Sequence, residues 1–355
     1  MGPPGGDENG TASVRYFSAA IGGLVPVHRR RRPDAPVPIS VHEAYLMTSP
    51  VVPASPPPST GDWGQLESAT APTGLVPRIR ELWSYRDLLR NLVVKELKVK
   101  YKDSALGFVW TLVRPLLYLL VYSVAIGIFL GAGRTIPDFG VYLFTGLLAW
   151  TLFTDVVGGA TGAIVSNAGL VKKVYFPREL LTFSVVGAAL INALLQVVVL
   201  IGAYAVTRQF PPVSDLYLVP LAVVVLVLFS TALGLILGAL NVYLRDVEYL
   251  VEVGLLLWFW MTPIVYDWTK VRQQLVVDHH LDWLFQVYLA NPMANVVLAF
   301  QRALWPAGHT PEGSAFFYDG NLALRLGVLG VASLLFLWVA MKVFDKAQGN
   351  FAQEL

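Results

Sequence analysis

Residues that could perform catalysis are few in this sequence and stand apart from one another. All five histidines lie outside the long apolar runs of the chain. His279 and His280 stand between Asp278 and Asp282, but adjacent side chains on a helix point in different directions, which disfavours a shared metal ion. The phosphate-binding pattern G-x-x-x-x-G-K-[ST] does not occur in the sequence. We therefore expect no catalytic residue, no metal site and no ATP hydrolysis in this chain.

Two carboxylates stand inside long apolar runs. Asp155 lies near the middle of one run, and Glu252 lies near the start of another. A carboxylate in a membrane is costly and is a functional candidate by default. A proton-coupled carrier would also need a relay of His, Glu or Lys, and none is visible in these runs. We therefore expect structural pairing of Asp155 with Ser, Thr or an opposing Arg.

A cationic stretch precedes the first long apolar run. Between residues 78 and 102, apolar residues recur at steps of three and four with cations between them. This pattern predicts an amphipathic helix in the plane of the lipid headgroups, and the alternative is an ordinary amphipathic helix packed on protein. Arg114 follows about two turns into the apolar run, where it either snorkels to the headgroups or faces a wet cavity.

The connection of residues 166–180, SNAGLVKKVYFPREL, is the sharpest local signal in the sequence. It is polar at its start and then mixes apolar residues with cations, which are Leu170, Val171, Lys172, Lys173, Val174, Tyr175, Phe176 and Arg178. A bare turn between two spans needs no such side chains. This content suits docking into a groove on a partner protein, and the alternative is a half-turn buried among lipid headgroups.

Aromatic residues recur through three of the apolar runs. They are Trp110, Tyr118, Tyr122, Trp150, Phe153, Trp258, Phe259, Trp260 and Tyr266. Taken singly, each is expected to serve packing or an interfacial belt. Taken together, flat amphipathic rings also suit the wall of a channel that conducts a polymer.

The composition identifies the kind of protein that carries these residues. The chain has 355 residues, of which 55% are hydrophobic and 14% charged, whereas soluble proteins average about 25% charged residues. Several apolar runs approach the roughly 20 residues needed to cross a bilayer. We therefore expect an all-α integral membrane protein. The absence of cysteine excludes disulfides and thiol chemistry.

Six membrane spans are predicted, and they leave a long connection before the last one. The spans cover about 107–131, 141–165, 181–206, 217–241, 248–267 and 322–343. Lys and Arg gather in the flanks on one side, which places both termini in the cytosol. The external connection holds the stretch 281–305, broken at Asn291-Pro292. We expect two short helices that dip back from the outer face, and the alternative is an interfacial hairpin.

The N-terminal residues form a separate part of the chain. Residues 1–74 are rich in Pro, Gly, Ser and Ala and show no sustained helical or strand period, which predicts a disordered cytosolic tail. The transmembrane domain is expected to cover 75–355.

These features together resemble the membrane subunits of ABC-2 type exporters, in the branch that exports lipid-linked polysaccharides such as O-antigen, teichoic acid and mycobacterial galactan. Four stretches carry the resemblance, which are LKVKYKDSALGFVWTLVRPLLY (97–118), NAGLVKKVYFPREL (167–180), NVYLRDVEYL (241–250) and TPIVY (262–266). The resemblance covers roughly residues 78–350 and does not include the tail.

The resemblance implies a homodimer bound to two copies of a separate ATPase subunit, which would bind the ATP and Mg²⁺. It implies that 78–102 is an interface helix at the inner leaflet and that the helices of 281–305 help to close the outer mouth. The coupling contact with the ATPase falls on Asn167, Leu170, Val171, Lys172, Lys173, Tyr175, Phe176, Pro177 and Arg178. The cations for a polyprenyl pyrophosphate are Arg90, Lys95, Lys98, Lys100, Lys102 and Arg114. The channel is lined by Trp110, Tyr118, Tyr122, Trp150, Phe153, Trp258, Trp260 and Tyr266.

The expected function is therefore a permease that exports a lipid-linked polysaccharide across the cytoplasmic membrane of a bacterium, with ATP hydrolysis in the partner subunit. One alternative keeps the fold but exports a drug or a lipid. Another is a membrane glycosyltransferase that uses polyprenyl substrates, which would require a carboxylate pair or a metal site beside a span. The identity of the glycan does not follow from these residues.

Overall fold

The computed structural model describes residues 83–101, 110–318 and 320–355 of the chain. Within these ranges the structure is helical and contains no strand, in agreement with the predicted fold class. The described residues all belong to the unit formed by residues 70–355, which is considered by itself. The predicted tail (1–74), the start of the predicted interface helix and Lys102 lie outside the described residues.

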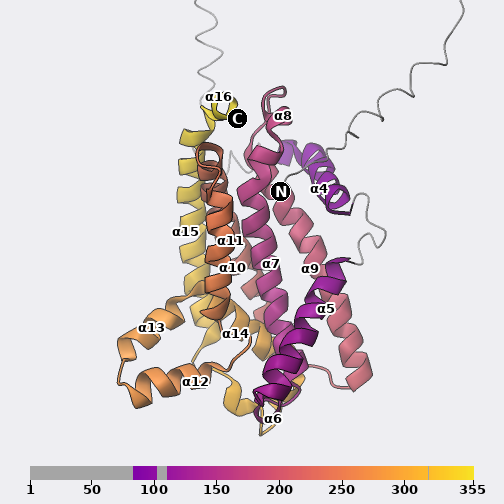
Figure 1. The fold of residues 1–355 in the computed structure, drawn as a ribbon, viewed down its shortest axis with the longest axis vertical. Helices are drawn as coiled ribbons and strands as arrows, with labels where there is room; N and C mark the ends of the chain where they lie inside the picture. The colour runs from indigo at the N-terminus through magenta and orange to yellow at the C-terminus, as the bar shows by residue number, and fades with distance from the viewer. Residues whose placement is uncertain (1–82, 102–109, 319) are drawn as a thin grey trace, which may run out of the picture. The chain divides into compact units, whose positions relative to one another are not determined.

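Among the described residues, four helices are each long and apolar enough to cross a bilayer. They are α7 (Phe139–Ser166), α9 (Glu179–Thr207), α10 (Leu218–Tyr243) and α15 (Leu322–Gln348). The shortest has 26 residues, which at 1.5 Å per residue extend roughly 39 Å, more than the hydrocarbon core of about 30 Å. The axes of the four helices are roughly aligned in Figure 1, with α7 and α9 running in opposite directions. Their ranges coincide closely with the second, third, fourth and sixth predicted spans.

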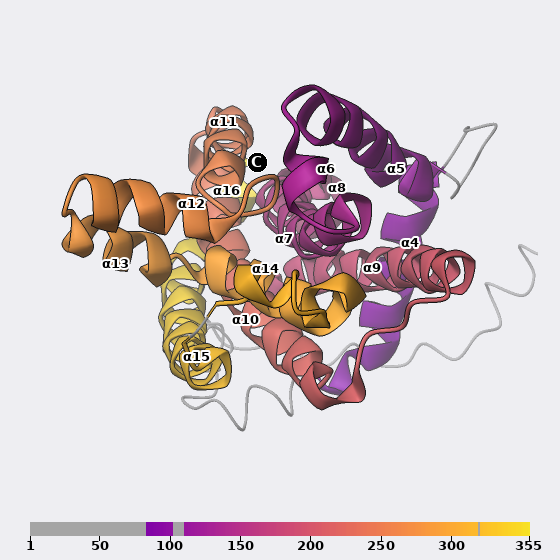
Figure 2. The ribbon, with the colours of Figure 1, turned by 90° about the horizontal axis from the view of Figure 1, so that it is seen from below.

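α7 is the central helix of the described bundle. It is in contact with α5 (Trp110–Tyr122), α9, α10, α11 (Val247–Trp260) and α14 (Pro292–Leu304), and these helices surround it when the bundle is viewed from below (Figure 2). α15 packs on the far side of α10. Most side chains of α7 are buried, so this helix forms the core against which the outer helices pack.

Small residues bring α7 and α10 close together, as the recurrence of Gly in the apolar runs suggests. A Cβ atom on Gly238 of α10 would lie 2.8 Å from the backbone oxygen of Ala160 in α7. A Cβ atom on Gly234, one turn earlier, would lie 2.6 Å from Cβ of Ala160. The two backbones therefore approach more closely than any larger residue at these positions would allow.

Gly238→Leu should destabilise the protein, because the new side chain would clash with the backbone of α7. Unlike a side chain, that backbone cannot move aside by changing its rotamer. Overpacking of this kind costs about 1–3 kcal/mol, which should lower the melting temperature of the purified protein in detergent. Gly327→Leu in α15 is the matched control, since a Cβ there has no neighbour within 4 Å. Equal melting temperatures for the two variants would contradict the close contact.

The first and fifth predicted spans are not established by the structure. α5 continues into a π-helical segment, Ser123–Phe129, and the residues that precede it, 102–109, are not described. α11 has 14 residues and ends at Trp260 instead of reaching 267 as predicted, because Pro263 cannot continue a helix. At roughly 21 Å, α11 alone is shorter than the hydrocarbon core.

The stretch after α11 contains the break that the sequence predicts. α12 (Trp268–Arg272) leads through a π-helical segment, Gln273–Asp278, to α13 (Asp282–Ala290), and α13 and α14 are bent by 76° at Asn291-Pro292. The Asn291 side chain caps α14 by accepting from the backbone N–H of Met293 at 3.0 Å. It also accepts from the indole N–H of Trp258 at 2.9 Å, which ties the bend to α11.

α14 is a core helix of the described bundle and not a surface hairpin. Met293, Val296 and Val297 are fully buried, and α14 packs against α7 and α10. Gln301 donates to the carbonyl of Pro263 at 3.0 Å, and the indole of Trp305 donates to the carbonyl of Pro137 at 3.0 Å. Non-helical backbone around the bend is thus shielded by protein, which is the condition for placing it at membrane depth.

Candidate functional site

The segment 167–178 joins α7 to α9 and is called the connecting turn below. It consists of Asn167, the single helical turn α8 (Ala168–Val171) and an irregular stretch that ends where α9 begins at Glu179. Figure 1 shows α8 and the loop after it standing at the upper end of the bundle, where the C-terminal helix α16 (Phe351–Glu354) also lies.

One side of the connecting turn is exposed and the other is anchored. The side chain of Tyr175 is 97% exposed, and Lys172, Lys173 and Val174 are exposed with it. Val171 and Phe176 are each 5% exposed and belong to a buried apolar cluster. The exposed Tyr175 ring therefore stands on a part of the turn that the buried Phe176 holds in place, and it is available for contact with a partner.

The C-terminal helix supports the anchored side. Phe351 is fully buried in the same cluster as Phe176, its ring packs on Phe344 at 5.5 Å between centroids, and the guanidinium of Arg178 lies 5.8 Å from its centre. The hydroxyl of Tyr243 donates to the carbonyl of Ala347 at 2.9 Å, which fixes the end of α15 to α10. Sequence reasoning missed this role of Phe351, since a lone Phe after Gly349-Asn350 carries no periodic signal.

The amphipathic helix α4 (Arg86–Tyr101) reaches the connecting turn from another direction. The ammonium group of Lys95 donates to the side-chain oxygen of Asn167, and the Asn167 amide donates to the carbonyl of Ala163 at 2.8 Å. Asn167 is therefore held between α4 and the last turn of α7. Two residues predicted for different roles, a cation for the substrate and a coupling residue, are in direct contact.

α4 packs on protein along one face and exposes the other. Leu92 is buried, and Val93 lies so close to α9 that a Cβ on Gly187 would be 2.8 Å from its Cγ2 atom. Arg90, Lys98 and Val99 are exposed. One face of α4 therefore packs on protein and the other is exposed, and a position in the plane of the lipid headgroups stays a prediction.

Asp155 in α7 is paired with Lys100 in α4. The ammonium group of Lys100 lies 3.2 Å from Oδ2 of Asp155, and the Asn192 amide of α9 donates to the same oxygen at 3.4 Å. Asp155 lies about three helical turns, or roughly 16 Å, before the end of α7. The expected pairing of Asp155 is present, but the predicted partner was wrong, since Lys and Asn take the place of Ser, Thr or Arg.

The pair between Lys100 and Asp155 is partly shielded. The side chains are 44% and 20% exposed, respectively, so the pair lies between an exposed ion pair and a buried one. Of the predicted substrate cations, Lys95 and Lys100 thus already have partners in the protein, whereas Arg90 and Lys98 are exposed. Lys102 is outside the described residues. Arg114 lies in α5, and its side chain is not described, so its role stays a prediction.

The predicted channel aromatics form a connected series of rings across α5, α11 and α7. Tyr118 stacks on Tyr122 at 6.1 Å, Tyr122 on Phe259 at 5.7 Å, and Phe259 meets Trp150 at 5.5 Å. Trp150 in turn packs against Phe153, which is fully buried.

Burial divides this series into an inner and an outer part. Trp150 and Phe153 lie in the core, and Trp258 is half-buried beside Asn291. Tyr118 and Trp260 are exposed, Tyr122 and Tyr266 are half-buried, and the hydroxyl of Tyr266 donates to the carbonyl of Trp260 at 3.0 Å. The side chain of Trp110 is not described. A channel-lining role stays a prediction for the outer rings. Phe153 is fully buried, so it cannot line a channel in this arrangement.

A known protein family matches more than half of the chain. The family described as "ABC-2 type transporter" matches residues 87–305. This range begins in α4 and ends just after α14, so it contains the connecting turn and the pair between Lys100 and Asp155.

Several characterised relatives have export or transport functions in their names. The chain is 32% identical over 283 residues to the O-antigen export system permease protein RfbA of Myxococcus xanthus, covering 79% of this chain and 100% of that protein. It is 28% identical to the O-antigen export system permease protein RfbA of Klebsiella pneumoniae, covering 76% and 95%. It is 23% identical to the polysialic acid transport protein KpsM of Escherichia coli, covering 68% and 90%.

Proposed function

The chain belongs to the ABC-2 type transporter family, and from that premise we propose that it is the membrane-spanning permease subunit of an ATP-driven exporter of a lipid-linked polysaccharide. The relatives named above support the class of substrate, because they are permeases for O-antigen and a transport protein for polysialic acid. The membrane is the cytoplasmic membrane of a bacterium, and both termini are cytosolic.

The connecting turn is the observation that carries this proposal. Its anchored side is fixed by Phe176 and Phe351, and its free side presents Tyr175 with Lys172 and Lys173. A rigidly anchored turn that exposes an aromatic ring beside two lysines is suited to bind in a groove on another protein, since aromatic residues are frequent binding hot spots. We assign that groove to a separate ATPase, which binds ATP and Mg²⁺.

The exporter contains two copies of this chain, and each copy engages one ATPase. α5 and α11 both expose large apolar side chains, among them Leu117, Leu120, Leu256 and Leu257. Such continuous apolar faces suit lipid or a second copy of the chain. The exposed rings Tyr118 and Trp260 lie on the same two helices, so a pathway between the copies would be lined by them.

The outward face of α4 is the proposed entrance for the substrate. Arg90 and Lys98 are exposed there, and Lys100 follows at the end of the helix, partly exposed beside Asp155. A polyprenyl pyrophosphate carries several negative charges, for which Lys and Arg are the natural partners. Because Lys95 contacts Asn167 in the connecting turn, binding at α4 has a direct physical route to the ATPase contact.

The proposed cycle follows from these parts. The lipid-linked glycan meets the cations of α4 at the inner leaflet. ATP binding closes the two ATPases, and the connecting turns transmit this motion to α7 and α9. The glycan then moves outward past the exposed rings, and the segment from α12 to α14 closes the outer mouth.

Joint expression with a separately encoded ATPase tests this proposal. We expect the two proteins to co-purify, the complex to hydrolyse ATP, and depletion of the chain in its host to leave lipid-linked glycan on the cytosolic side. Transport by the chain alone, driven by a proton gradient, would contradict the proposal. Accumulation of a drug or a lipid without any accumulation of glycan would keep the ATPase partner but overturn the substrate.

A further inference from the structure

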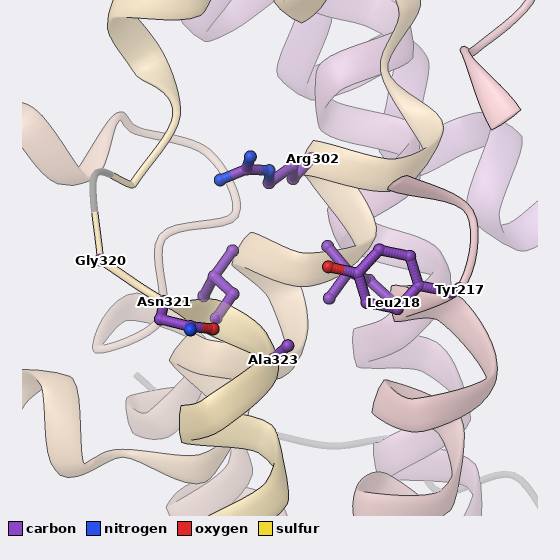
Figure 3. Close-up of a pocket in the computed structure, with 7 residues that line it drawn as sticks. Tyr217, Leu218, Arg302, Gly320, Asn321 and Ala323 are labelled. Atoms are coloured by element: carbon purple, nitrogen blue, oxygen red, sulfur yellow. The ribbon is translucent and has the colours of Figure 1, made fainter. Parts of the chain in front are cut away.

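A polar cavity lies at the end of the bundle opposite the connecting turn. It measures about 300 Å³ and is formed where α10 begins, α14 ends and α15 begins, with Tyr217, Arg302, Asn321 and Ala323 among its walls (Figure 3). The volume is at the lower end of the range of about 300–1,000 Å³ for small-molecule sites. With both termini in the cytosol, this end of the bundle faces the outer side of the membrane.

Arg302 is held so that its guanidinium projects toward the cavity. Its Nε donates to Oδ2 of Asp215 at 3.1 Å, and the guanidinium lies 5.6 Å from the centre of the Phe317 ring. In Figure 3 the guanidinium points into the open space above the start of α15. Because Arg302 is fixed by a carboxylate and a ring outside the cavity, its Nη donors are preorganised for a ligand.

Two further side chains complete a polar recognition set. Tyr217 is 57% exposed, and in Figure 3 its ring stands across the space from Asn321. The side-chain oxygen of Asn321 accepts from the backbone N–H of Leu324 at 3.0 Å and so caps α15. The side-chain amide N–H₂ of Asn321 has no hydrogen bond in the described part of the chain that would prevent its use by a ligand.

The charge balance at the cavity selects the class of ligand. The positive charge of Arg302 is compensated by Asp215, so a phosphate or another strongly anionic group would gain little electrostatic energy by binding there. A neutral ligand rich in hydroxyl groups can instead accept from Arg302 and Asn321 and lay an apolar face on the ring of Tyr217. A sugar ring has these properties.

We propose that this cavity binds one sugar unit of the exported glycan on the outer side of the membrane. This inference rests on the proposed function, because it takes its ligand from the transported polymer. A unit held at the outer end would oppose backward sliding of the chain while the ATPases reset.

The test is ligand binding to the full complex of permease and ATPase in phosphatidylcholine nanodiscs. The probes are the methyl glycosides of glucose, galactose, mannose and rhamnose, observed by saturation-transfer NMR. We expect at least one glycoside to bind and Ala323→Phe, which fills the cavity from α15, to abolish the signal. Tyr217→Ala should weaken binding about tenfold, or about 1.4 kcal/mol. Leu324→Phe is the control, since Leu324 is 66% exposed and does not line the cavity.

Three results would overturn the inference. They are the failure of every glycoside to bind, binding that survives both Ala323→Phe and Tyr217→Ala, and displacement of the glycoside by glycerol 3-phosphate, which would identify a lipid-headgroup site. Co-purification with the ATPase serves as the folding control for each variant. It also separates the two proposals. An intact complex that binds no sugar would contradict only the proposed sugar site, whereas failure to form the complex would contradict the proposed function.

Discussion

Replacing Tyr175 by Ala should weaken the complex between the permease and its ATPase by about thirtyfold while leaving the permease itself as stable as before. The side chain is almost fully exposed, so its removal opens no cavity in the fold. An aromatic hot spot in an interface contributes about 2 kcal/mol or more, and 2 kcal/mol corresponds to roughly thirtyfold in Kd. Titration of purified permease with labelled ATPase would measure the change.

Two companion variants separate docking from folding. Val213→Ala removes a side chain that is also largely exposed, at the other end of the bundle, and should change neither Kd nor the melting temperature. Phe176→Ala removes a buried ring and should lower stability by about 3–5 kcal/mol, which would appear as a lower melting temperature. If the Tyr175→Ala complex binds and hydrolyses ATP as the wild type does, the docking role of the connecting turn is wrong.

Asp155→Asn and Lys100→Met should shift the response to lipid pyrophosphate in opposite directions. Asp155 holds Lys100 in the structure, so neutralising Asp155 releases the ammonium group to an anionic ligand. Asp155→Asn should therefore lower the concentration of undecaprenyl pyrophosphate that half-stimulates the ATPase of the reconstituted complex. Lys100→Met should raise it, because one cation is lost. Shifts in the same direction would show that Lys100 has only a structural role.

The same two variants also measure the ion pair. Exposed pairs contribute about 0–1 kcal/mol, and breaking a buried pair costs about 3–5 kcal/mol. Since this pair is partly shielded, we expect about 1–2 kcal/mol for each single variant. The double variant should lose less than the sum of the two, which is the signature of a direct contact. Leu324→Phe in α15 is again a suitable control, since it is remote from both residues.

The sequence predicted the helices that are defined by a long apolar run and placed the end of α11 too late. Each of α7, α9, α10 and α15 carries an apolar run long enough to span the bilayer, and backbone in that environment must be helical to satisfy its hydrogen bonds. α11 ends at Trp260 because Pro263 cannot continue the helix. The apolar residues after Pro263 are what extended the predicted span to 267. For α14 the sequence left two possibilities open, a helix that dips back from the outer face and an interfacial hairpin, and its packing against α7 and α10 disfavours the hairpin.

The candidate site shows the same division between local and distant information. The character of the connecting turn is local, because cations and aromatics follow one another within 167–178, and it could be predicted. The partners of its residues could not be predicted, because Lys95 and Asn167 are 72 positions apart and Lys100 and Asp155 are 55 apart. No periodicity in one sequence joins residues across such separations. Packing of α4 on α9 is what brings them together.

The burial of Phe351 also sets an order of events during biosynthesis. The connecting turn is made early, between α7 and α9, whereas the ring that supports it is made only after α10, α11, α14 and α15. Until residue 351 has been added, Val171 and Phe176 lack part of their apolar cover and remain the kind of surface that chaperones and proteases recognise. We therefore expect chains truncated before Phe351 to be degraded faster than the full chain, which a pulse-chase experiment would measure.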